Sequence, residues 1–293
     1  MTYYLSSKNV SLQVDHPLKN YQGSRFDYTG KIISVKFKGA EIAGIERKQP
    51  ENTNNLGRGF YNEFGMENPI GYDEAKPGDW FHKIGLGLLQ RDESPYSFLK
   101  NYPIKPAHFE IEESESCLKI SCIGGLISDY AYQLNKEIKV LENGFEIKSQ
   151  LKNTGNKTIK TNEYNHNFIG INNEPIDENI CLNLPFSPKQ EEFFENVDPE
   201  KLICIKGNMI ELAKSPTKDF FLGKINGSQK AQTNWELTHK KLKIGISEIG
   251  DFKLQKFNLW GCNHVISPEM FIEINLAPNQ AISWSRKYIF STL

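Results

Sequence analysis

The residue best suited to acid–base chemistry in this sequence is His166, which lies between two asparagines in the segment 161–171 (TNEYNHNFIGI). The unperturbed pKa of histidine lies close to neutrality, so a rigidly held imidazole is a natural proton donor or acceptor. A histidine among aromatic residues can equally be a hydrogen-bonded structural residue. The sequence therefore leaves His166 with two interpretations, a catalytic group or a structural one.

A second candidate is Glu269, which follows Pro268 at the boundary of a strand-like segment. Proline fixes the backbone just before it, and apolar neighbours such as Phe271 and Trp260 would raise the pKa of a carboxyl placed among them. A glutamate tuned in this way is a useful base near neutral pH. Glu273, in the strand that follows, is the alternative carboxylate, and an exposed strand-end position is the alternative environment for Glu269.

The sequence lacks the motifs of several common enzyme classes. It has no GxSxG, no HExxH, no Walker-type loop and no Rossmann fingerprint. Its six histidines never fall at a close metal-ligand spacing, and its five cysteines include no CxxC pair. We therefore expect neither a metal site nor a disulfide framework.

Charge and hydropathy exclude further classes of function. The chain of 293 residues carries 35 basic and 36 acidic residues, a formal net charge of -1, and it has no basic stripe for a phosphate backbone. We therefore expect no nucleic-acid binding. No apolar run is long enough to cross a bilayer, and residues 1–20 lack the basic and apolar regions of a signal peptide. These features predict a soluble, cytoplasmic protein with no membrane partner.

Two pairs of segments are predicted to position the candidate groups. Residues 145–153 alternate apolar and polar side chains with the period of two that is typical of a half-buried strand. A turn at 154–156 and a returning strand at 158–164 predict a β-hairpin that carries His166 at its far end. Residues 271–276 and 282–290, joined by a Pro-Asn turn, predict a closing hairpin beside Glu269.

The remaining chain has the same β texture. Residues 3–5 and 10–14 predict two short opening strands, and residues 25–39 read as strand, turn and strand. An Asn143-Gly144 turn predicts a further hairpin. Many short strands with turns at this spacing are typical of a large antiparallel β-sandwich, and no linker-like segment divides the sequence. We predict one all-β domain over residues 1–293.

Two segments depart from this pattern. Residues 41–106 are rich in glycine, proline, asparagine and aromatic residues, and such a long irregular segment is usually functional or wrongly assigned. We interpret it as loops and short strands that line a cleft, with structural loops stabilised by their own aromatic residues as the alternative. Residues 185–201 are the best helical or irregular stretch.

The motifs around both candidates resemble those of one known family. Residues 153–157 (NTGNK) and 162–168 (NEYNHNF) resemble the N-T-G-(D/N)-K and N-x-x-x-H-x-x-F stretch of galactose mutarotase-like proteins, the aldose 1-epimerase superfamily. Residues 267–280 (SPEMFIEINLAPNQ), followed by Trp284 and a Tyr-Ile-Phe triplet, resemble the closing segment of that family. The β-sandwich texture fits the family over nearly the whole chain.

The resemblance implies a galactose mutarotase-like supersandwich whose concave face binds a carbohydrate. Enzymes of this family interconvert the α and β anomers of an aldose and need no metal or organic cofactor. His166 matches their general acid, which protonates the ring oxygen, and Glu269 is the best match for the base, with a shift to Glu273 as the alternative. Ring opening, rotation about the C1–C2 bond and reclosure complete the reaction.

The remaining site residues match the family less well. The family has an arginine and a second histidine before the central segment, for which Arg58 and His82 are the candidates, with Lys83 as the alternative substrate-facing residue. Asn165 beside the catalytic histidine and the flat ring of Trp260 are further candidates for sugar binding. The family's sugar-gripping aspartate has no counterpart that can be placed.

These departures keep two other functions open. One is a catalytically silent carbohydrate-binding protein on the same fold. The other is a phosphosugar epimerase that holds phosphate through Arg58, Lys83 and Arg91. The sequence leaves the identity of the sugar and the oligomeric state open.

Overall fold

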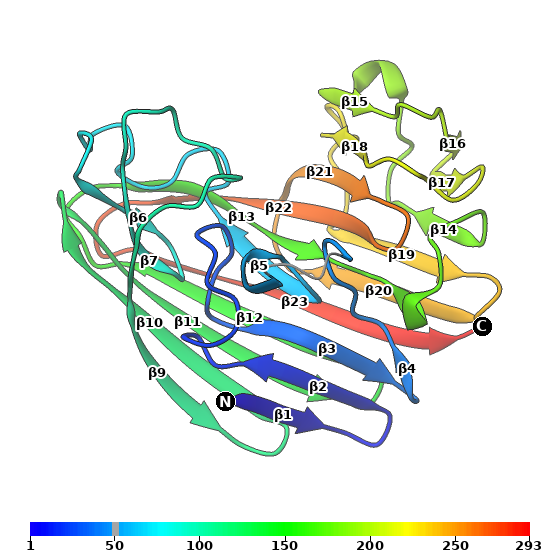
Figure 1. Cartoon of the computed structure of the whole chain (residues 1–293), viewed down its shortest axis with the longest axis horizontal. Coiled ribbons are helices and arrows are strands. Elements are labelled where there is room, and N and C mark those ends of the chain that lie inside the picture. Colours follow the sequence, from blue (N-terminus) through cyan, green and yellow to red (C-terminus); the bar gives the residue numbers. More distant parts are fainter. Residues whose placement is uncertain (49–52) are drawn as a thin grey trace.

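The structure is a computed structural model that describes residues 1–48 and 53–293. Two large antiparallel sheets pack face to face, and a small third sheet lies to one side (Figure 1). This arrangement confirms the predicted all-β sandwich. Across the same two stretches of chain, no helix is long and apolar enough to span a membrane.

In the first sheet, the two outer strands on one side come from the chain's beginning, and the middle of the chain and its last segment meet at its centre. The strands follow, in spatial order, as β1 (Thr2–Ser6), β2 (Val10–Asp15), β3 (Lys31–Phe37), β5 (Phe60–Phe64), β13 (Ile159–Asn167), β22 (Ile266–Leu276), β21 (Leu254–Gly261), β18 (Phe220–Gly223) and β15 (Glu195–Val197), with β4 (Ala40–Glu41) paired to β3.

The second sheet is formed by the remaining long strands. Its spatial order is β16 (Ile203–Lys206), β17 (Met209–Leu212), β14 (Ile180–Asn183), β19 (Asn234–His239), β20 (Ile244–Gly250), β23 (Ala281–Thr292), β12 (Gly144–Asn153), β11 (Tyr130–Leu141), β10 (Cys117–Ile127) and β9 (His108–Glu113). The small sheet and the short 3₁₀ turns are β6 (Trp80–Lys83), β7 (Gly87–Gln90), β8 (Ile104–Pro106), η1 (Thr53–Asn55), η2 (Ile171–Asn173) and η3 (Gln190–Glu192).

The core lies between the two large sheets. Alternate residues of each strand point inward, as the period of two requires, and Val35 and Met270 of the first sheet share one buried apolar cluster with Phe145 and Tyr288 of the second. The rings of Phe145 and Tyr288 stack with their centroids 4.5 Å apart. Burial of these side chains provides the main force that holds the sheets together.

Both hairpins predicted around the candidate residues are wrong, although their strands are present. β12 pairs with β11 and β23 in the second sheet, whereas β13 pairs with β5 and β22 in the first. β22 and β23 likewise belong to different sheets. The turns at 154–158 and 277–280 therefore cross the edge of the sandwich. The Asn143-Gly144 turn does join a paired hairpin, β11 and β12.

Other predictions are corrected in detail. The two opening strands are confirmed as β1 and β2. Residues 25–30 form a bent loop instead of a strand, because Phe26 packs into a buried aromatic cluster and Asp27 turns inward to form an ion pair with Lys136. The segment 41–106 contributes β5 to the first sheet, and its positions 49–52 lie outside the described residues.

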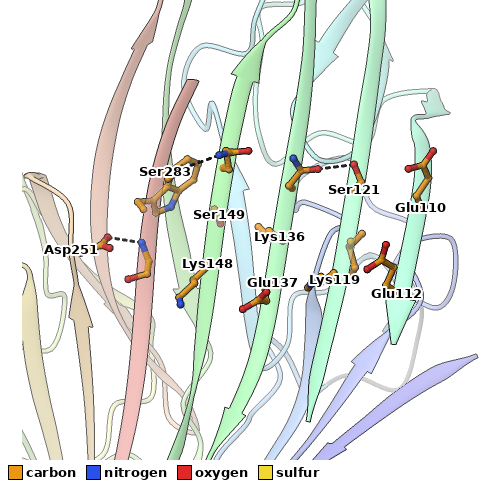
Figure 2. A pocket seen from close by; sticks show the side chains of 15 residues that line it. Glu110, Glu112, Lys119, Ser121, Lys136, Glu137, Lys148, Ser149, Asp251 and Ser283 are labelled. Carbon is orange, nitrogen blue, oxygen red and sulfur yellow. Dashed lines mark hydrogen bonds between the residues drawn. The ribbon is translucent and has the colours of Figure 1, made fainter. Parts of the chain in front are cut away.

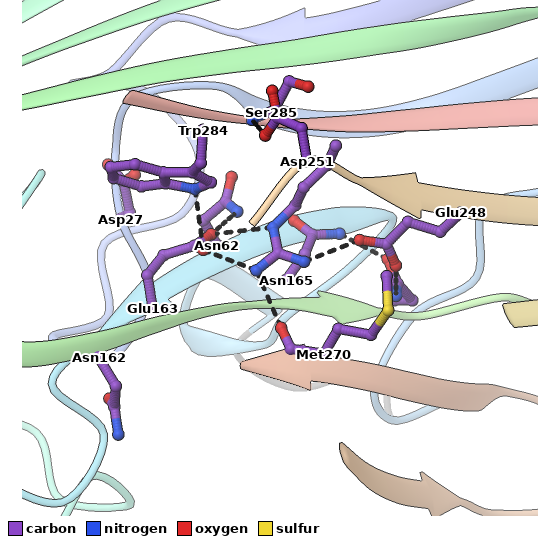
Figure 3. A network of polar contacts seen from close by, with 12 residues as sticks. Asp27, Asn62, Asn162, Glu163, Asn165, Glu248, Asp251, Met270, Trp284 and Ser285 are labelled. Atoms are coloured by element: carbon purple, nitrogen blue, oxygen red, sulfur yellow. Dashed lines mark hydrogen bonds and ion pairs between the residues drawn. The ribbon is translucent and has the colours of Figure 1, made fainter. Parts of the chain in front are cut away.

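A buried polar network joins the sheets directly behind the centre of the first sheet (Figure 3). Arg286 on β23 donates to Glu163 on β13 at 2.6 Å, to the carbonyl of Met270 on β22 at 2.9 Å, and to Glu248 on β20 at 2.8 Å. Trp284 Nε1 donates to the same Glu163 at 3.1 Å. Because charged groups in a low-dielectric interior are stable only when paired, this network fixes β13 and β22 relative to each other.

Candidate functional site

His166 and Glu269 lie side by side on the outer face of the first sheet. Tyr164 of β13 pairs with Phe271 of β22, and the same antiparallel register, continued two residues further, sets His166 opposite Glu269. His166 Nε2 lies 3.4 Å from Glu269 Oε1. The two residues are only 4% and 3% exposed. The structure thus brings together the two groups that the sequence singled out from distant segments.

Both groups line one open cavity of about 780 Å³. Its floor consists of three neighbouring strands, β13, β22 and β21, and its walls come from the loops before β3 and after β4, β5 and β7 and from the chain at β15 and β18. The residues on the floor strands are Tyr164, His166, Lys256, Asn258, Trp260 and Glu269, and the wall residues are Arg25, Glu46, Arg47, Met66, Glu67, Phe98, Leu99, Phe194, Glu195, Phe221, Gly223 and Lys224.

Burial changes the proton affinity of both groups in opposite directions. Desolvation raises the pKa of the Glu269 carboxyl to about 8, against lowering contributions from the charge of Arg25 and a hydrogen bond from Ser267. Desolvation lowers the pKa of His166 well below its usual value, and the Arg25 charge lowers it further. At neutral pH the pair therefore holds one transferable proton on the carboxyl next to a neutral imidazole.

Aromatic rings hold the His166 imidazole in place. It stacks on Phe168 with ring centroids 4.0 Å apart and an interplanar angle of 8°, and Trp260 meets it edge-on at 5.3 Å. Its Nδ1 is buried and has no hydrogen-bond partner among the described residues. The ring is thus oriented by packing, with Nε2 on the side of Glu269.

Arg25 is the cavity cation whose charge acts on both His166 and Glu269, and carboxylates hold its guanidinium in place. Its Nε donates to Glu63 Oε2 at 2.9 Å, and its Nη2 donates to the hydroxyl of Tyr164 at 2.9 Å. Tyr164 in turn donates to Glu63 at 2.7 Å, and Lys83 donates to the other Glu63 oxygen at 3.1 Å. Glu46, at 3.5 Å from Arg25 Nη1, completes the set. A guanidinium fixed in this way presents N–H donors at a set position.

Two of the predicted substrate-binding residues belong to this region. Trp260 lies in the cavity floor, half-buried, with the guanidinium of Arg47 5.5 Å from its ring centroid. Lys83 is fully buried one layer behind the cavity, where it is bound to Glu63, to the Gly65 carbonyl and to the Tyr96 hydroxyl. It supports Arg25 through the shared Glu63 but does not line the cavity.

Three other predicted residues lie elsewhere. Asn165 neighbours His166 in the strand and therefore points to the opposite face, where its amide donates to Tyr288 inside the sandwich. His82 is buried against Tyr132, its Nε2 is 3.0 Å from the Tyr130 carbonyl, and burial lowers its pKa to about 4. Arg58 is exposed and does not line the cavity. Their placement does not support a role in binding substrate.

The alternative assignments are not favoured by the geometry either. Glu273 is exposed, pairs with Asn162 further along β22 and does not line the cavity. Arg91, proposed to hold a phosphate, donates to the carbonyls of Tyr72 and Ala75 and stacks on the Tyr72 ring, so its guanidinium has a structural role.

The sequence reasoning missed Arg25, Glu63 and Asn258. The signal for Asn258 was present, because it is two residues before Trp260 and so shares its face of β21. Arg25 gave no such signal, since it lies on a loop that resembled a strand. Glu63 lies within five consecutive buried residues of β5, and its burial is explained only by the Arg25 and Lys83 partners that tertiary structure supplies.

A second hollow, of about 530 Å³, lies on the outer face of the second sheet (Figure 2). Most of its side chains are solvated charged and small polar groups such as Glu110, Lys119 and Lys148. Lys136 and Trp284 turn inward from it, to Asp27 and Glu163. None of the side chains that line it is an imidazole, whereas the first cavity holds His166 beside Glu269. No three His, Cys, Asp or Glu side chains in residues 1–48 and 53–293 are placed to hold a metal ion.

Comparison with known proteins identifies the fold. No family model matches the sequence, and no curated protein matches it. Solved structures do match over the full length. A protein from Escherichia coli K12 that is proposed to be an aldose 1-epimerase shares 10% identity, with 100% of this chain and 99% of that chain covered and a TM-score of 0.64.

Two further matches are similar in extent. A galactose mutarotase related enzyme from Lactobacillus acidophilus is 10% identical, with 100% and 98% of the two chains covered and a TM-score of 0.62. A galactose mutarotase-like protein from Lactobacillus casei is 12% identical, with 99% and 100% covered and a TM-score of 0.59. The chain therefore has the galactose mutarotase-like fold expected from its motifs.

Proposed function

We propose that this chain, which has the galactose mutarotase-like fold, is an isomerase that interconverts the α and β anomers of a sugar with a free anomeric carbon. The observation that carries the proposal is the contact between His166 Nε2 and Glu269 Oε1, 3.4 Å long, on the floor of an open cavity. Opening a cyclic hemiacetal requires a proton to leave the O1 hydroxyl and another to reach the ring oxygen. A donor and an acceptor held side by side meet that requirement.

His166 and Glu269 together can give one proton and take one proton, as a reaction with no net uptake or release of protons requires. In the opening step His166 donates to the ring oxygen while Glu269 accepts the O1 proton. This leaves a protonated carboxyl, a neutral imidazole and an open-chain aldehyde. Rotation about the C1–C2 bond exposes the other face of the aldehyde. In the closing step Glu269 returns its proton to the carbonyl oxygen and His166 accepts the proton of the attacking hydroxyl, which restores the starting state.

The raised pKa of Glu269 and the lowered pKa of His166 favour the form present with the open-chain sugar. The opposite form, which begins ring opening, is reached by moving the shared proton across the contact between the two groups. General acid–base catalysis of this kind typically raises a reaction rate by about 10²–10⁴-fold.

Arg25 supports the proposal as a group that contacts the substrate. Its guanidinium lines the cavity and is held by Glu63 and the Tyr164 hydroxyl. We assign it the role of hydrogen-bond donor to the sugar oxygens, where negative charge develops as protons leave. Trp260 offers an apolar face to the ring, and Asn258 offers an amide for its hydroxyls.

The test is saturation-exchange NMR between the anomers of a panel of aldoses, with and without the protein. Accelerated exchange of at least one sugar, lost in His166→Ala, supports the proposal. Absence of acceleration for every hexose, pentose and reducing disaccharide tested would refute it. Calorimetric binding without acceleration would instead identify a carbohydrate-binding protein.

A further inference from the structure

The cavity that holds the acid–base pair extends to an apolar rim that anomer exchange at a single ring does not need. Phe194, just before β15, is 84% exposed, and Leu99, on the loop between β7 and β8, is 74% exposed. Phe221 on β18 and Phe98 beside Leu99 are half-buried, and all four line the same cavity as His166. Large apolar side chains gathered at a cavity mouth normally mark a binding surface.

The cavity is larger than one sugar ring. A hexose occupies roughly 200 Å³ at the packing density of organic crystals, whereas the cavity measures about 780 Å³. The floor beside His166 and Glu269 accommodates the reacting ring, so the space toward the rim is left for a further group. Figure 1 shows the loops around β6 and the strands β15 and β18 on the same side of the first sheet. Residues from both regions line the cavity.

Polar groups are interleaved with the apolar rim. Glu195 follows Phe194 directly, and Asn258 and Lys224 lie toward the same wall, where Asn258 Oδ1 accepts a hydrogen bond from the backbone N–H of Lys224. Glu67, on the side opposite β15, pairs with Lys256. A pyranose ring presents C–H groups on its faces and hydroxyls around its edge. Aromatic faces with carboxylates, an amide and ammonium groups between them match both features.

We propose that the outer part of the cavity is a second sugar-binding subsite, and that the substrate is a reducing disaccharide or longer oligosaccharide. Its reducing-end ring lies against His166 and Glu269, and the next ring lies on Phe194 and Phe221. This assignment rests on the proposed anomer exchange for its orientation, because only the reducing end has a free anomeric carbon. The subsite itself is inferred from the apolar rim residues and does not depend on that activity.

The test compares exchange rates for disaccharides and their parent hexoses. Wild-type protein is measured with maltose, cellobiose and lactose against glucose and galactose, and then with Phe194→Ala and Phe221→Ala. We expect each substitution to lower kcat/KM for the preferred disaccharide about ten-fold, since one stacking contact is worth about 1.4 kcal/mol. Exchange of the hexose should change less than about two-fold.

Tyr4→Ala is the matched control, because Tyr4 is an aromatic residue 67% exposed on β1, at the opposite edge of the same sheet. It should leave every rate unchanged. Phe194 is so exposed that its truncation leaves the core intact, and thermal unfolding checks the fold of each variant.

The outcomes separate this proposal from the proposed function. If hexoses and disaccharides exchange equally fast and both Phe variants match wild type, the subsite is refuted and the isomerase stands. If a hexose bearing an apolar 6-O-acyl group is preferred over every disaccharide, the rim binds an apolar substituent and the proposal is overturned. If no sugar exchanges but calorimetry shows disaccharide binding that Phe194→Ala abolishes, the subsite stands and the isomerase falls.

Discussion

Glu269→Gln should be more stable than the wild-type protein, by a margin that grows as pH rises, and should lose activity. The carboxyl is 3% exposed and its neutral form is favoured by burial, so ionising it inside the folded protein is costly. Glutamine has nearly the same shape and cannot ionise. The substitution therefore removes the destabilisation that an ionised Glu269 carboxylate, buried in the cavity floor, imposes on the fold.

The magnitude follows from the pKa of Glu269 in the two states. The carboxyl has a pKa of 4.5 when exposed and about 8 in the folded protein. Between these values the folded state holds a proton that the unfolded state has released, so wild-type stability falls as pH rises. Each pH unit in this interval lowers the wild-type free energy of unfolding by about 1.4 kcal/mol, and the whole interval lowers it by about 5 kcal/mol. Below pH 4.5 the group has no effect, because both states are protonated.

Urea denaturation of wild type and Glu269→Gln at intervals from pH 4.5 to 9 measures this difference. The other titrating groups are common to both proteins, so subtracting the two free energies of unfolding isolates Glu269. The difference should grow steadily with pH in favour of Gln and level off above about pH 8. A difference that is constant with pH, or that favours wild type at high pH, would show that the carboxyl is ionised in the folded protein and would refute this reasoning.

Three further predictions concern the pH profile, Arg25 and the buried network. The anomer exchange rate should be flat around neutrality and fall above about pH 8, as Glu269 loses the shared proton; an increase through pH 8 in the NMR exchange rate would contradict this. Arg25→Gln should lower kcat and shift the high-pH decrease in exchange rate to higher pH, because the Arg25 charge lowers the pKa of both Glu269 and His166. A pH profile identical to that of wild type would show that the Arg25 charge does not act on these two groups. Arg286→Met should cost about 3–5 kcal/mol in urea denaturation, because it leaves two buried carboxylates without a cation. Lys148→Met on the exposed face of the neighbouring strand is its control and should change stability by less than about 0.5 kcal/mol.

The sequence was sufficient to locate many of the strands and to single out His166 and Glu269, which the structure places side by side. Alternation with a period of two is a local signal, and it located β1, β2, β12 and β13 correctly. It was not sufficient for the pairing of those strands. A Thr-Gly-Asn turn reverses the chain whether the next strand joins the same sheet or the facing one, and the apolar pattern of each strand is the same in both cases. The crossovers after β12 and β22 depend on tertiary packing.

The same period could have corrected one site assignment. Neighbouring residues in a strand face opposite sides, so His166 in the cavity places Asn165 in the core, as the contact with Tyr288 shows. Arg25 could not have been located in this way. Its position depends on Glu63 and Tyr164, which lie far away in sequence, and on a loop whose apolar residues imitate a strand.

A double-mutant cycle on anomer exchange tests most directly whether His166 and Glu269 act as one proton-transfer pair. Exchange rates of the best substrate are measured by saturation-transfer NMR for wild type, His166→Gln, Glu269→Gln and the double variant. Members of one catalytic unit are strongly non-additive. The account therefore predicts that each single substitution lowers kcat by about 10²–10⁴-fold and that the double variant is no slower than the slower single one. Single variants that retain wild-type rates, or losses that simply multiply, would contradict it.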